Sequence, residues 1–190
     1  MRPRFSTTEI KDILKSWFVI SLAFGILITN NLFSAEILIN FSIALFTVGI
    51  GFLLHELAHK FLAQKYRYFA EFKADNKMLL IAIATAFFGF LFAAPGGVMI
   101  GGGSDNRKLS LIAAAGPATN LFLALVFFIL SNIALLKLIG EYGFFINSWL
   151  ALFNLIPFFP FDGGKIIQGN KILYFCLLVI ALSFMLFGLL

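Results

Sequence analysis

The only two histidines of the chain occur in the segment His55-Glu56-Leu57-Ala58-His59. On an α-helix, residues four apart lie on one face, one turn above each other, so both imidazoles could reach one metal ion. The glutamate between them lies close enough to act as a general base on a water at that metal. The spacing H-E-x-x-H therefore predicts a zinc peptidase site, with His55 and His59 as ligands and Glu56 as the catalytic residue.

The composition places this segment in an integral membrane protein. Apolar residues make up 61% of the 190 residues, charged residues make up 12%, and the mean hydropathy is +1.00. A soluble domain has about 45–50% apolar and about 25% charged residues. The basic residues behind the net charge of +5 are spread over several hydrophilic segments, which does not favour a nucleic-acid partner. The lipid bilayer, with its anionic headgroups, is the expected partner.

The hydropathy pattern predicts an all-α polytopic membrane protein with about five to six transmembrane helices. All 190 residues are expected to form one intramembrane metalloprotease domain, with its core at about 37–170. Residues 1–16 are mixed-charge and polar, which indicates a cytoplasmic segment lying at the membrane interface. Residues 137–142 are expected to form a loop. The expected spans are 17–33, about 37–62, about 109–136, 143–156 and 172–190.

Two segments between the second and third of these spans do not fit a simple transmembrane helix. Residues 66–74 alternate loosely and are aromatic, which predicts a short strand at the membrane edge. The glycine density of residues 95–103 excludes an ordinary helix there. We therefore expect residues 78–103 to form a hairpin or a re-entrant element, with the glycine-rich piece as its returning arm.

The basic residues also predict a topology. If the N-terminus is cytoplasmic and residues 78–108 leave and return on one side, every one of the 14 lysines and arginines except Lys137 lies on the cytoplasmic side. A single crossing by residues 78–94 would place Asp162 on the opposite side from the histidines. The sequence thus predicts a multi-pass protein whose N-terminus and active-site opening are cytoplasmic.

A catalytic zinc takes three protein ligands, so one ligand besides the histidines must be found. The only cysteine, Cys176, lies in the last span and is a poor candidate. Asp162 lies between a hydrophobic span and a glycine pair, where a carboxylate is expected to be paired or metal-bound. Glu71, which is on the expected side of the membrane, remains the alternative.

These motifs resemble the site-2 protease family of intramembrane zinc metalloproteases, in a minimal form without accessory domains. H-E-x-x-H in a transmembrane helix and the later Asn154-x-x-Pro157-x-x-x-x-Asp162-Gly163 carry the resemblance over about residues 40–170. Gly116-Pro117-x-x-Asn120 and Pro95-Gly96-Gly97-Val98 resemble further elements of the family.

The resemblance implies one catalytic zinc ion, bound by His55, His59 and Asp162, with Glu56 as the general base. It also implies that Asn154 lies near the site and contacts substrate. Asn120 is a second candidate for substrate contact, and the alternative for both asparagines is hydrogen bonding between helices.

The predicted function is a zinc-dependent intramembrane endopeptidase that cleaves a transmembrane protein substrate in or near its membrane segment, as in regulated intramembrane proteolysis. The alternative is a catalytically inactive metal-binding membrane protein that binds and holds membrane segments, or a metal transporter. The intact Glu56 disfavours an inactive protein. Transport is disfavoured because ionisable residues are confined to two of the expected spans.

Overall fold

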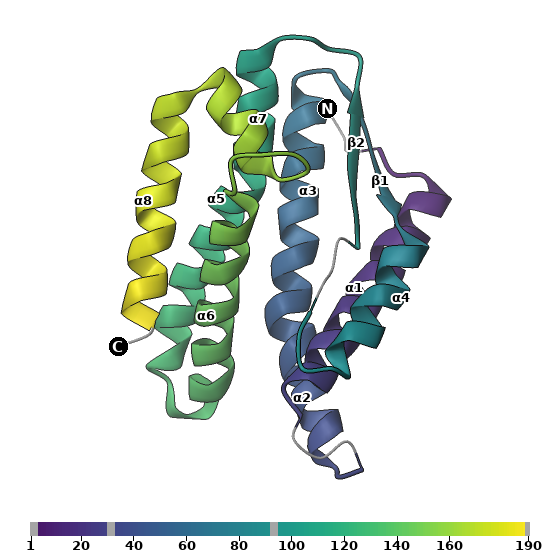
Figure 1. Cartoon of the computed structure of the whole chain (residues 1–190), viewed down its shortest axis with the longest axis vertical. Helices are drawn as coiled ribbons and strands as arrows, with labels where there is room; N and C mark the ends of the chain where they lie inside the picture. The colour runs from purple at the N-terminus through teal and green to yellow at the C-terminus, as the bar shows by residue number, and fades with distance from the viewer. Residues whose placement is uncertain (1–3, 30–32, 92–94, 189–190) are drawn as a thin grey trace.

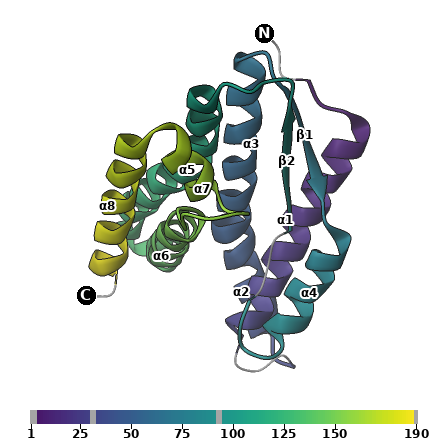
Figure 2. The same cartoon turned by 45° about the horizontal axis from the view of Figure 1, so that its top comes forward.

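The computed structural model describes residues 4–29, 33–91 and 95–188. Its central element is helix α3, which stands between two groups of elements (Figures 1 and 2). One group contains α5 to α8, and the other contains α1, α2, α4 and a two-stranded sheet. The helices are α1 (Thr7–Leu27), α2 (Glu36–Ala44), α3 (Ile50–Lys65), α4 (Asn76–Ala86), α5 (Asn106–Ser131), α6 (Lys137–Asn154), α7 (Asp162–Gly169) and α8 (Lys171–Gly188). The strands are β1 (Phe69–Ala74) and β2 (Gly96–Gly101).

Helices α2 and α3 form one continuous stretch, Glu36–Lys65, joined by a π-helical segment at Leu45–Gly49. This helical stretch contains the span expected at about 37–62 and continues to Lys65. Gly49 and Gly51 let the neighbouring helices come close, because a Cβ at either position would overlap side chains of α1 or α6. The predicted ligands His55 and His59 lie in the second half of this stretch.

Ser6 caps the start of helix α1, since its hydroxyl accepts a hydrogen bond from the Glu9 amide (3.0 Å). The expected boundary between an interfacial segment at 1–16 and a span beginning at residue 17 does not coincide with a break in the helix. One helix runs through it, because small and apolar residues on one face, such as Ser16 and Ile20, are buried on both sides of the boundary. The end of the expected span at 17–33 falls partly on residues 30–32, outside the described residues.

The strand expected within residues 66–74 is confirmed as β1. It pairs antiparallel with the glycine-rich β2, from Phe69 opposite Gly101 to Ala74 opposite Gly96. Gly96 has a φ of +133°, and a Cβ there would overlap the carbonyl of Lys73. The chain therefore returns beside the strand that it left, as the hairpin expected for residues 78–103 requires, and α4 forms the excursion.

Helices α5, α6, α7 and α8, which form the group on the other side of α3, pack around a shared hydrophobic core. Asp105 caps the start of helix α5, and its carboxylate accepts the amides of Lys108 and Arg107. These backbone donors lower the pKa of Asp105 from its ordinary value. The loop expected at 137–142 is wrong, because these residues form the start of α6, where Lys137 and Glu141 pair across one helical turn (3.8 Å).

The class of membrane protein expected from the composition is confirmed in its coarse form. Among the described residues, three helical stretches are long and apolar enough to cross a membrane. They are Glu36–Lys65, Asn106–Ser131 and Lys171–Gly188. Two of these stretches supply residues of the site, and they lie side by side as α3 and α5 (Figure 1).

Candidate metal centre

The two histidines project from α3 toward α5 and α7, where they meet Asp162. The Nε2 atoms of His55 and His59 lie 3.0 Å apart. The Oδ2 atom of Asp162 lies 3.2 Å from Nε2 of His55 and 3.1 Å from Nε2 of His59. All three side chains are buried. The three residues predicted as metal ligands thus form one group, although Asp162 is distant from the histidines in sequence.

This group fits a zinc ion by donor type and by spacing. Two imidazole nitrogens and one carboxylate oxygen are the ligand set of many catalytic zinc sites, which keep a fourth position open. Bonds of about 2 Å at tetrahedral angles place ligand atoms roughly 3.3 Å apart. The observed separations of 3.0 to 3.2 Å are close to this value.

Asp162 reaches the histidines because α7 begins directly against the end of α6. A Cβ at Gly163 would overlap the carbonyl oxygens of Leu155 and Ile156, so only glycine allows this approach. Asp162 is the first residue of α7, and its carboxylate therefore projects from the turn toward α3. In the Asp-Gly pair of the sequence motif, Asp162 thus supplies the ligand and Gly163 allows the close packing of α7 against the end of α6.

Gly116 of α5 faces the two imidazoles directly. A Cβ at this position would overlap Nε2 of both His55 and His59. The absence of a side chain therefore leaves the space in which a metal ion would contact the histidines. The sequence motif Gly116-Pro117 did not reveal this role.

The second nitrogen of each imidazole is held by a neighbouring acceptor. Nδ1 of His59 lies 2.8 Å from the carbonyl oxygen of Ile112, and Nδ1 of His55 lies 2.5 Å from Oδ1 of Asn120. With the proton on Nδ1, each ring presents an unprotonated Nε2 to the metal. Such contacts fix the orientation of the metal-binding rings.

Asn120 is itself held in place by two acceptors. Its Nδ2 donates to the carbonyl of Gly51 (3.1 Å) and to Oδ1 of Asn147 (3.0 Å), and Asn147 donates to the carbonyl of Gly143 (2.9 Å). Both asparagines are fully buried. The structure thus places Asn120 against a metal ligand, which differs from the substrate contact considered for it. Sequence reasoning missed Asn147, whose only signal was a polar residue within an apolar stretch.

Glu56 lies on a different face of α3 from the histidines and points toward the sheet. Its Oε2 accepts a hydrogen bond from the backbone amide of Val98 in β2 (3.1 Å). The glycine-rich segment predicted as the returning arm therefore contacts the predicted catalytic residue. This contact fixes the carboxylate of Glu56, the residue that directly follows the ligand His55.

Two further candidates from the sequence have hydrogen-bond partners outside this group. Asn154 donates to the carbonyl of Leu150 on its own helix (2.9 Å) and is half-buried. Glu71, the alternative third ligand, pairs with Met99 in the sheet and accepts a hydrogen bond from the hydroxyl of Ser6 (2.8 Å). The metal group of the described residues contains Asp162 in its place.

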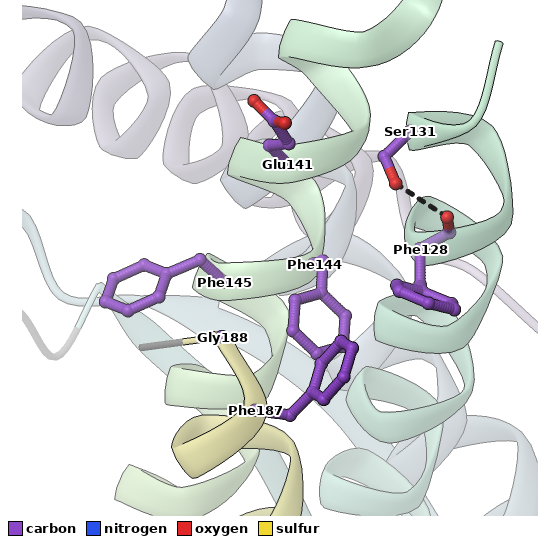
Figure 3. A pocket seen from close by; sticks show the side chains of 7 residues that line it. All are labelled: Phe128, Ser131, Glu141, Phe144, Phe145, Phe187 and Gly188. Atoms are coloured by element: carbon purple, nitrogen blue, oxygen red, sulfur yellow. Dashed lines mark hydrogen bonds between the residues drawn. The ribbon is translucent and has the colours of Figure 1, made fainter. Parts of the chain in front are cut away.

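The pocket drawn in Figure 3 is separate from the metal group. It has a volume of about 340 Å³ and lies between the end of α5, the start of α6 and the end of α8. Phenylalanine side chains line it, together with Glu141 and with Ser131, whose hydroxyl donates to the Phe128 carbonyl (2.7 Å). It contains none of the metal ligands.

Two curated relatives come from Methanocaldococcus jannaschii. The chain is 42% identical over 180 residues to a protein named "Putative zinc metalloprotease MJ0611", and the match covers 90% of this chain and 89% of the relative. It is 30% identical over 124 residues to "Zinc metalloprotease MJ0392", which covers 63% of this chain and 32% of that relative. No protein-family model and no solved structure matches the chain significantly.

Proposed function

This chain belongs to the zinc metalloprotease family of its Methanocaldococcus jannaschii relatives, and we propose that it is an intramembrane endopeptidase of the site-2 protease type. In this proposal it hydrolyses a peptide bond in or near a transmembrane segment of a substrate protein. The observation that carries the proposal is the buried group of His55, His59 and Asp162, with Glu56 between the two histidines in the sequence of α3. The two histidines and Glu56 belong to the apolar stretch Glu36–Lys65.

The cofactor is one zinc ion, for which His55, His59 and Asp162 supply the three protein ligands. When bound, zinc lowers the pKa of its water and polarises a peptide carbonyl. Glu56 accepts a proton from the attacking water and then donates it to the leaving amine. The amide of Val98 keeps the carboxylate of Glu56 in position for both transfers.

We propose that the substrate binds near Glu56 in an extended conformation. A helical segment hides its carbonyls in intrahelical hydrogen bonds, so it must unwind locally before cleavage. The outer edge of β1 is occupied by α1, where Glu9 accepts the Phe72 amide (2.8 Å). The other edge of the sheet, on β2, faces Glu56. A substrate strand beside β2 would therefore pass next to the catalytic carboxylate.

We also propose that the N-terminus and the opening of the site face the cytoplasm. The end of α3 and the starts of α5 and α8 lie at one end of the molecule, and the start of α6 lies at the other (Figure 1). The first three carry Lys65, Lys108 and Lys171, whereas α6 begins with Lys137. Basic residues favour the cytoplasmic side. In this arrangement α1 and α6 join the three long apolar stretches to give five spans, and α4 enters and returns on the same side.

The test of the proposal is cleavage of a tagged transmembrane substrate by the purified protein in detergent. Wild type is compared with Glu56→Gln, which keeps the size of the side chain but cannot accept the proton. We expect both proteins to bind one zinc and only the wild type to cleave. Equal cleavage by both would refute the peptidase proposal. Zinc binding with no cleavage by the wild type would favour a module that holds membrane segments.

A second comparison tests the substrate class. The wild type is given the transmembrane substrate and an unfolded soluble peptide that contains the same bond. We expect the transmembrane substrate to be cleaved faster. Equal rates for the two substrates would reject membrane segments as the preferred class.

A further inference from the structure

A buried ion pair lies one helical turn from the catalytic glutamate. Nζ of Lys60 lies 2.7 Å from Oε1 and 2.8 Å from Oε2 of Glu9, and both side chains are 1% exposed. Lys60 belongs to α3 and Glu9 to α1. Burial of two charges costs several kcal/mol, which paired hydrogen bonds must offset. A pair at this depth therefore requires an explanation.

Both members of the pair also bind the outer edge of β1. Nζ of Lys60 donates to the carbonyl of Ala70 (2.9 Å), and Oε1 of Glu9 accepts the amide of Phe72 (2.8 Å). Phe72 is the cross-strand partner of Val98. The ion pair thus joins α1, α3 and β1 at one point.

These contacts form a closed ring that includes the catalytic residue Glu56. Glu56 and Lys60 are four residues apart, so they lie on one face of α3. From Glu56 the ring passes to the Val98 amide, across the sheet to Phe72, to Glu9, and through Lys60 back to α3. The position of β2 relative to α3 is therefore fixed at two places, directly at Glu56 and through Glu9 and β1 at Lys60.

We propose that Glu9 and Lys60 are positioning residues that hold the sheet, and with it the Val98 amide, at a fixed distance from Glu56. Among the described residues, the hydrogen bonds and ion pairs of Glu9 and Lys60 include no metal ligand, so we expect the pair to act on the proton acceptor and not on the zinc ligands. The expected effect of the pair on the rate of cleavage rests on the proposed peptidase function. The expected effect of the pair on the position of the sheet does not depend on that function.

The test removes both charges together, with the double substitution Glu9→Gln and Lys60→Met. A single substitution would leave one buried charge unpaired and would unfold many proteins. In the double variant the amide oxygen at position 9 can still accept the Phe72 hydrogen bond, so α1 and β1 stay joined while both lose their hydrogen bonds to residue 60 of α3. The matched control is Asp12→Asn, which alters another contact between α1 and β1, at the Ala74 amide (3.2 Å).

Zinc content, thermal unfolding, hydrogen exchange of the peptide 95–101 and the kinetics of cleavage are measured for four proteins: the wild type, the double variant, Asp12→Asn and Lys60→Arg. We expect the double variant to keep its zinc and its cooperative unfolding, with faster exchange in peptide 95–101 and unchanged exchange in α5. Its kcat is expected to fall roughly 100-fold, as for a displacement near 1 Å of a catalytic group. Asp12→Asn is expected to behave like the wild type, and Lys60→Arg is expected to retain most of the activity.

Unchanged exchange in peptide 95–101 of the double variant would overturn the proposal, as would a wild-type kcat. Loss of zinc or of folding would assign the pair a structural role and would overturn it too. If the wild type cleaves no substrate, the proposed function fails, and the exchange measurement still decides whether the pair positions the sheet.

Discussion

At the scale of single residues, the zinc site requires a residue without a side chain next to the two histidines. Gly116 lies against both imidazoles, and a Cβ there would overlap Nε2 of His55 and of His59. The substitution Gly116→Ala should therefore exclude zinc while leaving α5 intact, since alanine favours a helix more than glycine does. Metal analysis of the purified variant should show zinc at background level, with helical content unchanged.

The control for this prediction is Ala118→Gly, two residues later on the exposed face of α5. This change weakens the helix by about 1 kcal/mol but is far from the rings, so zinc should remain bound. Full zinc occupancy in Gly116→Ala would contradict the described approach of α5 to the histidines.

A second prediction concerns Asn147, which contacts Asn120 and through it His55. Asn147→Leu preserves the volume but removes the acceptor that holds the Asn120 amide. Loss of a partner that orients a metal-binding histidine lowers metal affinity about 10–100-fold. A competition titration with a zinc chelator should measure this loss. Ser148→Ala is the control, because that buried hydroxyl donates within α6, to the carbonyl of Phe144 (2.7 Å). Equal zinc affinity of the two variants would argue against a role of Asn147 in holding Asn120 against His55.

Which site residues could be predicted from the sequence depends on how local their geometry is. His55, Glu56 and His59 follow from helix periodicity alone. Asp162 required a chemical argument about an intramembrane carboxylate and the resemblance of its motif. Asn147 and the packing role of Gly116 depend on which helices become neighbours, and no local pattern encodes that.

At the scale of elements, strand β2 links the fold to the chemistry. Val98 points its amide away from β1, toward Glu56, so proline at this position would remove that hydrogen bond without removing a bond of the ladder. We expect Val98→Pro to keep zinc and to lower kcat roughly 100-fold through misplacement of Glu56. Val98→Ala retains the amide and should keep most of the activity. Equal kcat values for the two variants would exclude a role of this amide.

The elements themselves were predicted unevenly. The strand within residues 66–74 and the non-helical glycine-rich segment followed from alternation and from glycine density. The loop expected at 137–142 was wrong, because charged residues were taken to interrupt a helix. Helix α1 likewise continues without a break through residue 16, where an interfacial segment was expected to end. In the structure those charges lie on helices whose opposite faces pack, as Ser16 of α1 and Gly140 of α6 do.

At the scale of the whole molecule, the distribution of lysines predicts a topology that labelling can test. In a background with Cys176→Ser, the substitutions Lys137→Cys and Lys171→Cys place single thiols at opposite ends (Figure 1). A membrane-impermeant maleimide added to intact expressing cells should modify only the thiol at position 137. Permeabilised cells supply the control, because both thiols should then react. Labelling at position 171 in intact cells would reverse the proposed orientation.

The parity argument from the sequence required residues 78–108 to return to the side that they left, so that Asp162 could join the histidines. The pairing of β1 with β2 and the contact of Asp162 with both histidines agree with that requirement. The number of spans was less predictable, because α1 and α6 carry charged or polar residues along helices that are also partly buried by their neighbours.

The most direct test of the central claim is to map the bond that the protein cleaves. Wild type, wild type treated with a zinc chelator, and Glu56→Gln are each incubated in lipid vesicles with a single-pass membrane substrate, and the product termini are identified by mass spectrometry. We predict one cut within or beside the hydrophobic segment, made only by the wild type and restored after chelation by added zinc. A cut confined to soluble loops, or the same cut made by Glu56→Gln, would contradict the assignment as an intramembrane zinc peptidase.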